Sequence, residues 1–341
     1  MKRHVSVAIA VLAALAVGAC GGTTSTSTAS ATGNHPNLSG KTIKFIYNGT
    51  ASLSTVELLH AQEILKGWGA DTQMTYGGSA QVVFGAMQTD QADVLEFSPQ
   101  GALAGIDNGL DLKAFALDGP RMDYAFIAKP SIKTIKDLKG AKVGLLDTVG
   151  LNGIQVSMVL KAGGLNAGDV TVIPTGGQSA RVAALLSGRI DATMVGFANY
   201  LTLQKQGYNL LYSYTKEQPK MLDGVLWAKS GWLTSHKTEA VAINQAMIES
   251  FRWFNDPKNK AAWVKTATDN IKGADPAAIT EMYDTYKSND MYPANAILNL
   301  DQLSFNQDQY VAYKSLEKSL PVKQWADDTY AKQALDKEGK V

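Results

Sequence analysis

The amino-acid sequence predicts an α/β protein built from two lobes of similar design. Three observations support this prediction. Apolar strand-like segments alternate with helical patterns, the alternation recurs 98 positions later, and a similar apolar segment follows each copy. Such alternation favours a mostly parallel sheet covered by helices in each lobe.

The first copy shows four elements in order. Residues 43–47 are predicted as a strand, and residues 54–68 as an amphipathic helix that ends at Gly69. A second strand over residues 71–76 and a helix over residues 80–89 follow. This order of elements is typical of an α/β lobe.

The second copy keeps the order of elements at low sequence identity. Among the equivalent positions that carry the same residue are Lys44 and Lys142, Thr50 and Thr148, Gly78 and Gly176, and Asp93 and Asp191. Two long copies indicate a duplicated lobe rather than a repeat array. Asp93 and Asp191 each begin a strand, where turn formation explains them without a catalytic role.

Two apolar segments that both end in Ala-Lys are predicted to join the lobes, residues 124–129 and residues 225–229. We interpret them as the outgoing and returning strands of a hinge of two crossing strands. The helical remainder, about residues 238–334, would pack back on the first lobe. The predicted lobes are residues 41–124 plus 225–335 and residues 125–224. A ligand would bind between the lobes, where closure buries it.

Residues 1–19 have the pattern of a secretory signal peptide. A positively charged start and an apolar run too short to span a bilayer precede small residues and Cys20. Cys20 is the one cysteine in the sequence, and it stands where a lipoprotein signal peptidase would make it the new N-terminus. We predict a lipid on Cys20 and a flexible tether over residues 20–40. The alternative is an ordinary signal peptide cleaved nearby, which would leave a free thiol.

The charge balance argues against a nucleic-acid partner. The chain has 32 Lys and Arg residues against 31 Asp and Glu residues, a formal net charge of +1, and no basic stripe. With one cysteine there is no internal disulfide, so the fold depends on its core. We expect a monomer outside the cytoplasm, held to the membrane by the lipid on Cys20.

Four segments carry motifs of a known family. Residues 135–144 read IKDLKGAKVG, residues 181–192 read RVAALLSGRIDA, residues 86–94 read AMQTDQADV, and residues 254–257 read FNDP. They resemble motifs of the type II periplasmic binding proteins, in the nitrate/sulfonate/taurine branch (the NMT1/THI5-like family). The family's first-lobe motif usually has Gly where this chain has Asp90. The order and spacing of the motifs carry the resemblance more than any one motif does.

The resemblance covers about residues 41–321 and implies both a fold and a function. The implied fold is the two-lobed type II periplasmic-binding-protein fold. The implied function is that of an extracytoplasmic solute-binding lipoprotein, which delivers a small-molecule ligand to the permease of an ABC importer. Members of the family take sulfonates, nitrate-like anions, thiamine precursors, riboflavin-like compounds and aromatic acids.

Candidate ligand-binding residues follow from the rule that ligands gather at the carboxyl ends of strands and at helix N-termini. The segments that meet this condition are residues 48–52, 97–99, 147–152 and 196–199. The residues chosen from them and from the hinge segments are Asn48, Thr50, Ser52, Phe97, Ser98, Tyr124, Thr148, Asn152, Phe197, Asn199 and Trp227. For the Thr and Ser residues helix capping is the alternative, and for the aromatic residues it is core or hinge packing.

These residues suggest a ligand class without naming the ligand. Hydroxyls and N–H groups at helix starts suit a small organic anion, a sulfonate or a carboxylate. The aromatic residues favour the alternative of a thiamine-precursor pyrimidine or a flavin-like ring. An enzyme on the same fold and a ligand-presenting sensor are the other classes. No catalytic residue, metal or cofactor is predicted, because His60 and His236 lack acidic or cysteine neighbours in ligand spacing.

Overall fold

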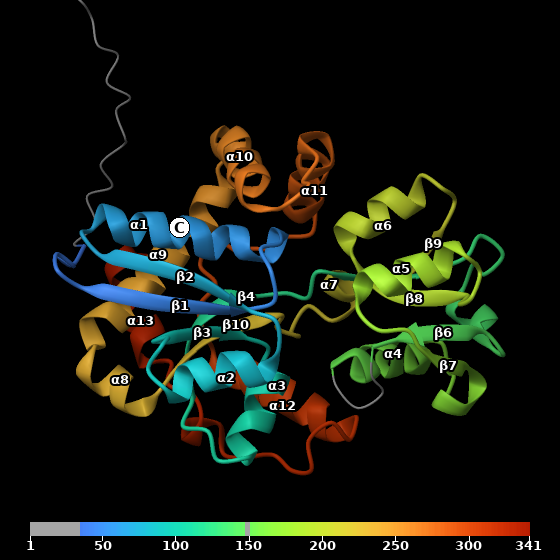
Figure 1. The fold of residues 1–341 in the computed structure, drawn as a ribbon, viewed down its shortest axis with the longest axis horizontal. Coiled ribbons are helices and arrows are strands. Elements are labelled where there is room, and N and C mark those ends of the chain that lie inside the picture. Colours follow the sequence, from blue (N-terminus) through green and yellow to red (C-terminus); the bar gives the residue numbers. More distant parts are fainter. Residues whose placement is uncertain (1–34, 147–150) are drawn as a thin grey trace, which may run out of the picture. The chain divides into compact units, whose positions relative to one another are not determined.

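The computed structural model describes residues 35–146 and 151–341, so the predicted signal peptide, Cys20, most of the tether and Thr148 lie outside the described residues. Within the described ranges the strands form two five-stranded sheets (Figure 1). The first sheet has the order β2-β1-β3-β10-β4, made of β1 (Thr42–Asn48), β2 (Asp71–Gly77), β3 (Val94–Phe97), β4 (Lys113–Gly119) and β10 (Gly224–Ala228). The second has the order β7-β6-β8-β5-β9, made of β5 (Tyr124–Ala128), β6 (Lys142–Leu145), β7 (Thr171–Pro174), β8 (Ala192–Gly196) and β9 (Asn209–Ser213).

The two sheets share one design. In each sheet an inner strand is parallel to both its neighbours, β1 to β2 and β3 in the first, and β6 to β7 and β8 in the second. Each sheet also has one antiparallel strand, β10 between β3 and β4, and β5 between β8 and β9. The predicted α/β fold with two similar halves is confirmed, with mixed sheets.

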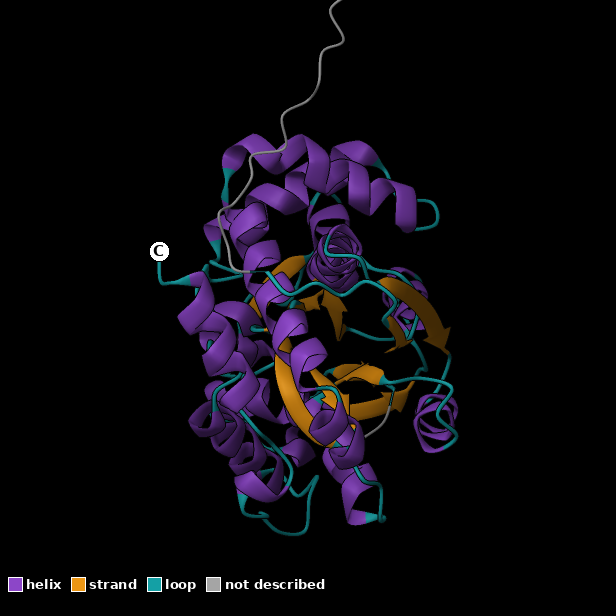
Figure 2. Ribbon diagram, turned by 90° about the vertical axis from the view of Figure 1, so that its left-hand side faces the viewer, coloured by secondary structure: helices purple, strands orange, loops and turns teal. Residues whose placement is uncertain are grey.

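Helices surround the strands (Figure 2). Those that follow strands are α1 (Val56–Gly67), α2 (Ala80–Gln88), α3 (Pro99–Asp107), α4 (Leu151–Ala162), α5 (Gln178–Leu186), α6 (Phe197–Gln204) and α7 (Tyr214–Glu217). Those after β10 are α8 (Ser230–Ser235), α9 (Lys237–Asn255), α10 (Lys260–Asn270), α11 (Pro276–Ser288), α12 (Leu300–Ala312) and α13 (Thr329–Glu338). None of the helices in the described ranges is both long and apolar enough to cross a bilayer.

The helices after β10 pack mainly around the first sheet. Both α9 and α13 lie against β4, α9 also packs on α1, and α12 packs on α3. One of these helices reaches the second half of the molecule, since α11 contacts α6. An ion pair of 2.7 Å between Lys205 and Glu281 accompanies this contact.

The 98-residue repeat appears in matching hydrogen bonds. The main-chain N–H of Lys44 donates to the carboxylate of Asp93 at 2.8 Å, and the N–H of Lys142 donates to Asp191 at 2.8 Å. Each acid thereby ties the start of one strand to its parallel neighbour. Asp191 also forms an ion pair of 2.5 Å with Lys129. These contacts support the structural role that the sequence assigned to both acids.

The segments predicted as hinge strands lie inside the sheets. The first is β5, an interior strand of the second sheet, and the other is β10, an interior strand of the first. Hydrogen bonds on both edges hold such strands in place. The chain crosses between the sheets just before them, at residues 120–123 and at residues 214–223. The segments that link the two sheets are therefore these two connections rather than the strands themselves.

Candidate functional site

A cavity of about 530 Å³ has walls from both halves of the molecule. The first half contributes the loop of residues 51–54 after β1, and the second contributes the beginnings of β5, α5 and α6. The loop of residues 271–275 and the start of α11 complete the wall. Asp275 caps α11, because its carboxylate accepts hydrogen bonds from the N–H groups of Ala277 and Ala278.

A smaller cavity of about 250 Å³ adjoins the larger one, since both are lined by Ser52, Ser54 and Tyr124. Its other lining residues lie mostly at the carboxyl ends of β1 and β3, and they are Tyr47, Asn48, Glu96, Phe97, Ser98, Leu151 and Asp223. We call the two cavities together the cleft, and the smaller one its inner chamber. The cleft lies where the rule for open α/β sheets predicts a ligand.

The structure brings together six of the residues predicted from the sequence. The cleft is lined by Asn48, Ser52, Phe97, Ser98, Tyr124 and Asn199. Two of these also serve local structure. Ser98 caps α3 by accepting the N–H of Gly101 at 3.3 Å, and Ser52 donates its own N–H to the Thr55 hydroxyl at 3.2 Å. Capping and cleft lining therefore coexist at both serines.

Four predicted residues are not among those that line the cleft. Thr50 is exposed on the loop after β1, Asn152 lies in the first turn of α4, and Phe197 is the buried first residue of α6. Trp227 has no exposed surface. Its indole N–H donates to the main-chain oxygen of Phe97 at 3.0 Å. A side chain with no exposed face has none to offer a ligand, so we exclude Trp227 from the proposed contacts.

Three carboxyl groups missed by the sequence reading form the floor of the inner chamber. Glu96 and Asp223 line it, and the carboxylate of Asp118 approaches that of Glu96 beside Gly224. We call these three residues the acidic floor. A Cβ on Gly224 would lie 2.3 Å from Glu96 Oε1 and 3.1 Å from Asp118 Oδ2. The absence of a side chain at Gly224 is therefore what allows the carboxyl groups to converge.

The acidic floor resists ionisation. Burial raises the pKa of Glu96 well above its usual range, and the charges of Asp118 and Asp223 raise it further. Burial likewise raises the pKa of Asp118, and it raises the pKa of Asp223 to about 7. At neutral pH the acidic floor is therefore partly protonated.

Two tyrosines stand beside the floor as hydrogen-bond donors. Burial, with the charges of Glu96 and Asp223, raises the pKa of Tyr47 well above its usual value. The charge of Asp223, with burial, raises the pKa of Tyr124. Both phenols therefore keep their protons at neutral pH.

Basic groups are scarce in the cleft. Among the described lining residues the one basic side chain is Lys272, which is exposed on the loop before α11. The buried guanidinium of Arg181 donates to the main-chain oxygens of Met194, at 3.2 Å, and of Gly176, at 3.0 Å. The lining of the cleft thus presents acids, amides, hydroxyls and aromatic rings, and the positive charge of the buried Arg181 acts on Tyr124.

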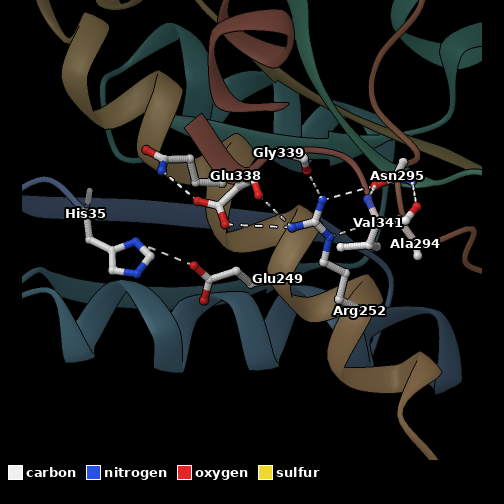
Figure 3. A network of polar contacts seen from close by, with 9 residues as sticks. His35, Glu249, Arg252, Ala294, Asn295, Glu338, Gly339 and Val341 are labelled. Atoms are coloured by element: carbon white, nitrogen blue, oxygen red, sulfur yellow. Dashed lines mark hydrogen bonds and ion pairs between the residues drawn. The ribbon is translucent and has the colours of Figure 1, made fainter. Parts of the chain in front are cut away.

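A second polar cluster joins α9 to the end of the chain (Figure 3). His35 Nδ1 lies 3.5 Å from Glu249 Oε1, and potential ligand atoms of His35, Glu249 and Glu338 lie within 4.8 Å of one another. Glu338 also accepts a hydrogen bond of 2.7 Å from Gln245 and faces Arg252 at 3.9 Å. Because Arg252 already supplies a positive charge there, we interpret the cluster as a structural contact between α9 and the C-terminal residues rather than as a metal site.

Comparison with known proteins identifies the family of the chain. The family model described as "NMT1/THI5 like" matches residues 75–260. The nitrate/nitrite binding protein NrtA of Nostoc sp. (strain PCC 7120) is 26% identical over 153 residues, which cover 42% of this chain and 34% of that protein. The matched region thus spans about a third of that relative's length.

Solved structures share the fold over most of the chain. A putative periplasmic sulfonate-binding protein, SsuA from Methylobacillus flagellatus, matches with a TM-score of 0.71 and 18% identity, over 87% of this chain and 94% of that one. The desulfurization enzyme DSZB matches with a TM-score of 0.64 and 15% identity, over 88% of this chain and 100% of that one. The chain therefore has the two-lobed fold of periplasmic binding proteins, a fold that an enzyme also uses.

Proposed function

We propose, because the chain belongs to the NMT1/THI5-like family, that it is an extracytoplasmic solute-binding protein of an ABC importer. It captures one small molecule in the cleft and presents the closed form to a membrane permease. The observation that carries the proposal is the cleft itself, whose walls come from both sheets and from α11. The Nostoc and Methylobacillus relatives, described as nitrate/nitrite-binding and sulfonate-binding, support it.

The proposed mechanism is closure of two lobes on the ligand. The lobes are residues 41–124 plus 225–335 and residues 125–224, and they bend at the connections before β5 and β10. Closure would bring the loop of residues 51–54 toward α6 and exclude water from the bound molecule.

We also propose that the lipid on Cys20 and the tether that follows it hold the protein at the membrane surface. Loss of membrane association in a Cys20→Ser variant would support the anchor, and unchanged association would refute it.

The proposed ligand is a small organic anion, a sulfonate or a carboxylate. Its polar head would lie near Ser52, Asn199 and the N-terminal turn of α6, where amide and hydroxyl groups can donate hydrogen bonds. The aromatic lining of the inner chamber favours a second candidate, a thiamine-precursor pyrimidine or a flavin-like ring. In either case the organic body would occupy the inner chamber.

A thermal-shift screen of the purified full chain tests the proposed function. The panel holds alkyl and aryl sulfonates, taurine, nitrate, aromatic acids, thiamine precursors and riboflavin. Binding to the folded state alone stabilises it by RT ln(1 + [L]/Kd), about 2.7 kcal/mol at a hundredfold excess over Kd. We expect one chemical class to raise the melting temperature and to be recovered unchanged. Recovery of an altered compound would instead favour the enzyme alternative that the desulfurization enzyme represents.

A further inference from the structure

We infer that the ligand carries a protonated nitrogen, which binds in the inner chamber against the acidic floor. The inference rests on the proposed function and narrows its organic anion to a zwitterion, in which an amine, an amidine or a protonated nitrogen heterocycle accompanies the anionic head. An anionic head near α6 and a cationic group against Glu96 and Asp223 would then belong to one molecule.

The first support is that the floor carboxyls lack partners. Glu96 is 8% exposed and lines the chamber, and its carboxyl group has no hydrogen-bond partner among the described residues. Asp118 is 2% exposed, and its Oδ1 has no partner in the same part of the chain. Burying polar groups without partners is costly, so an unpartnered carboxyl that faces a cavity indicates a donor that arrives with the ligand.

The second support is the aromatic surround of the same chamber. Tyr47, Phe97 and Tyr124 line it together with Glu96 and Asp223. The faces of aromatic rings attract cations, and this attraction grows when the site is shielded from water. Aromatic rings and carboxylates together favour a positively charged group over an anionic one.

The arrangement fits an organic group better than a metal ion. Within the described residues, the acids and histidines whose ligand atoms converge within 4.8 Å are those of the His35 cluster. The acidic floor does not meet that spacing, although Glu96 and Asp118 approach the same point beside Gly224. An amine or amidine can reach separated oxygens through several N–H donors, which a single ion cannot do.

Proton release on ligand binding provides a second way to detect the cationic group. Because burial raises the pKa of Asp223 to about 7 and that of Glu96 well above its usual range, the acidic floor holds protons at neutral pH before a ligand binds. A bound cation favours the ionised carboxylates, so its binding releases protons to the buffer. The groups that face Asp223 and share this equilibrium are Glu96, Asp118, Asp123, Tyr47, Tyr124 and Tyr310.

The test uses ligands that differ only in the charged nitrogen. Isothermal titration of the purified full chain compares taurine with ethanesulfonate and ethylamine, and 4-(aminomethyl)benzenesulfonate with 4-methylbenzenesulfonate and benzylamine. We expect the nitrogen-bearing member of a set to bind at least about 30-fold more tightly than its nitrogen-free partner, as for a buried charge pair. Titration at pH 7 in a weakly buffered phosphate solution, followed with a pH electrode, should show proton release for that member.

Two conservative variants and one control locate the effect. Glu96→Gln and Asp223→Asn should each reduce the preference for the nitrogen to less than about threefold, while their melting temperatures without ligand confirm folding. Glu249→Gln changes a partly buried carboxyl of raised pKa in the His35 cluster, outside the cleft, and should keep the full preference.

The outcomes separate the inference from the proposed function. Tight binding of the sulfonates with no preference for the nitrogen would overturn the cationic group and leave the solute-binding function in place. A preference that survives in both floor variants would overturn the assignment to the acidic floor. Failure of every compound in the two sets to bind would count against both the inference and the proposed anion.

Discussion

Replacing Trp227 by alanine is expected to lower the free energy of unfolding by about 3–5 kcal/mol, the range for removing a large buried aromatic side chain. Trp227 lies on β10 between β3 and β4 and has no exposed surface. Its ring stacks on Trp325 with the ring centroids 6.0 Å apart. The substitution also deprives the main-chain oxygen of Phe97 of its indole donor, which adds to the loss.

Urea unfolding of the wild type and of two alanine variants measures this effect. Trp232→Ala serves as the matched control, because Trp232 is half-buried and stacks on His236 at 4.9 Å. The control should lose less than half as much stability as Trp227→Ala. A Trp227→Ala protein that unfolds like the wild type but no longer binds ligand would contradict the core position and make Trp227 a ligand contact.

The second large effect is expected from Glu57→Gln at alkaline pH. Glu57 lies on α1 with no exposed surface, and its Oε1 accepts the indole N–H of Trp263 at 2.8 Å. Burial raises the pKa of Glu57 to about 8. Glutamine keeps the shape and an oxygen acceptor but cannot ionise. We therefore expect the variant to exceed the wild type in stability at pH 8 by on the order of 4 kcal/mol.

The sign of this effect follows from proton counting. Between pH 4.5 and about 8 the folded protein holds a proton on Glu57 that the unfolded chain releases. The stability contributed by that carboxyl is full below its unfolded pKa, and it is lost as pH rises through the folded pKa. Urea unfolding at pH 5 and pH 8 should show the two proteins converging at pH 5. Equal pH dependence of wild type and variant would contradict a raised pKa at Glu57.

The fold could be predicted because its signals are local and repeated. Each strand and helix can be predicted from the residues of its own segment. The equivalent acids Asp93 and Asp191 lie at the same turn in both copies. The ends of β1 and β3 likewise follow from local pattern, and Asn48, Ser52, Phe97 and Ser98, chosen from that pattern, line the inner chamber.

The acidic floor could not be predicted because distant segments form it. Asp118 lies one residue before the end of β4 and Asp223 directly precedes β10, and they approach each other only because β10 inserts between β3 and β4. No local pattern reveals which strand enters which sheet. One signal was available, since Glu96 is an acid within the otherwise apolar strand β3. A buried acid in such a strand requires a partner, and that requirement points to a functional site.

Trp227 was misplaced for a related reason. From the sequence, residues 225–229 are predicted to form a hinge strand at the edge of the cleft. As an interior strand β10 is buried throughout, so an aromatic residue on it belongs to the core.

The central claim is that one small molecule binds in the cleft, and titration of a blocked cleft tests it most directly. Ala198 lines the larger cavity on α6, so the phenylalanine of Ala198→Phe would fill space that the ligand needs. Val82→Phe, at an exposed position on α2, is the matched control. With the best compound from the thermal-shift screen, the account predicts one site per wild-type chain, unchanged affinity in Val82→Phe and at least tenfold weaker binding in a folded Ala198→Phe. Equal affinity in all three proteins would mean that the ligand binds elsewhere and would contradict the account.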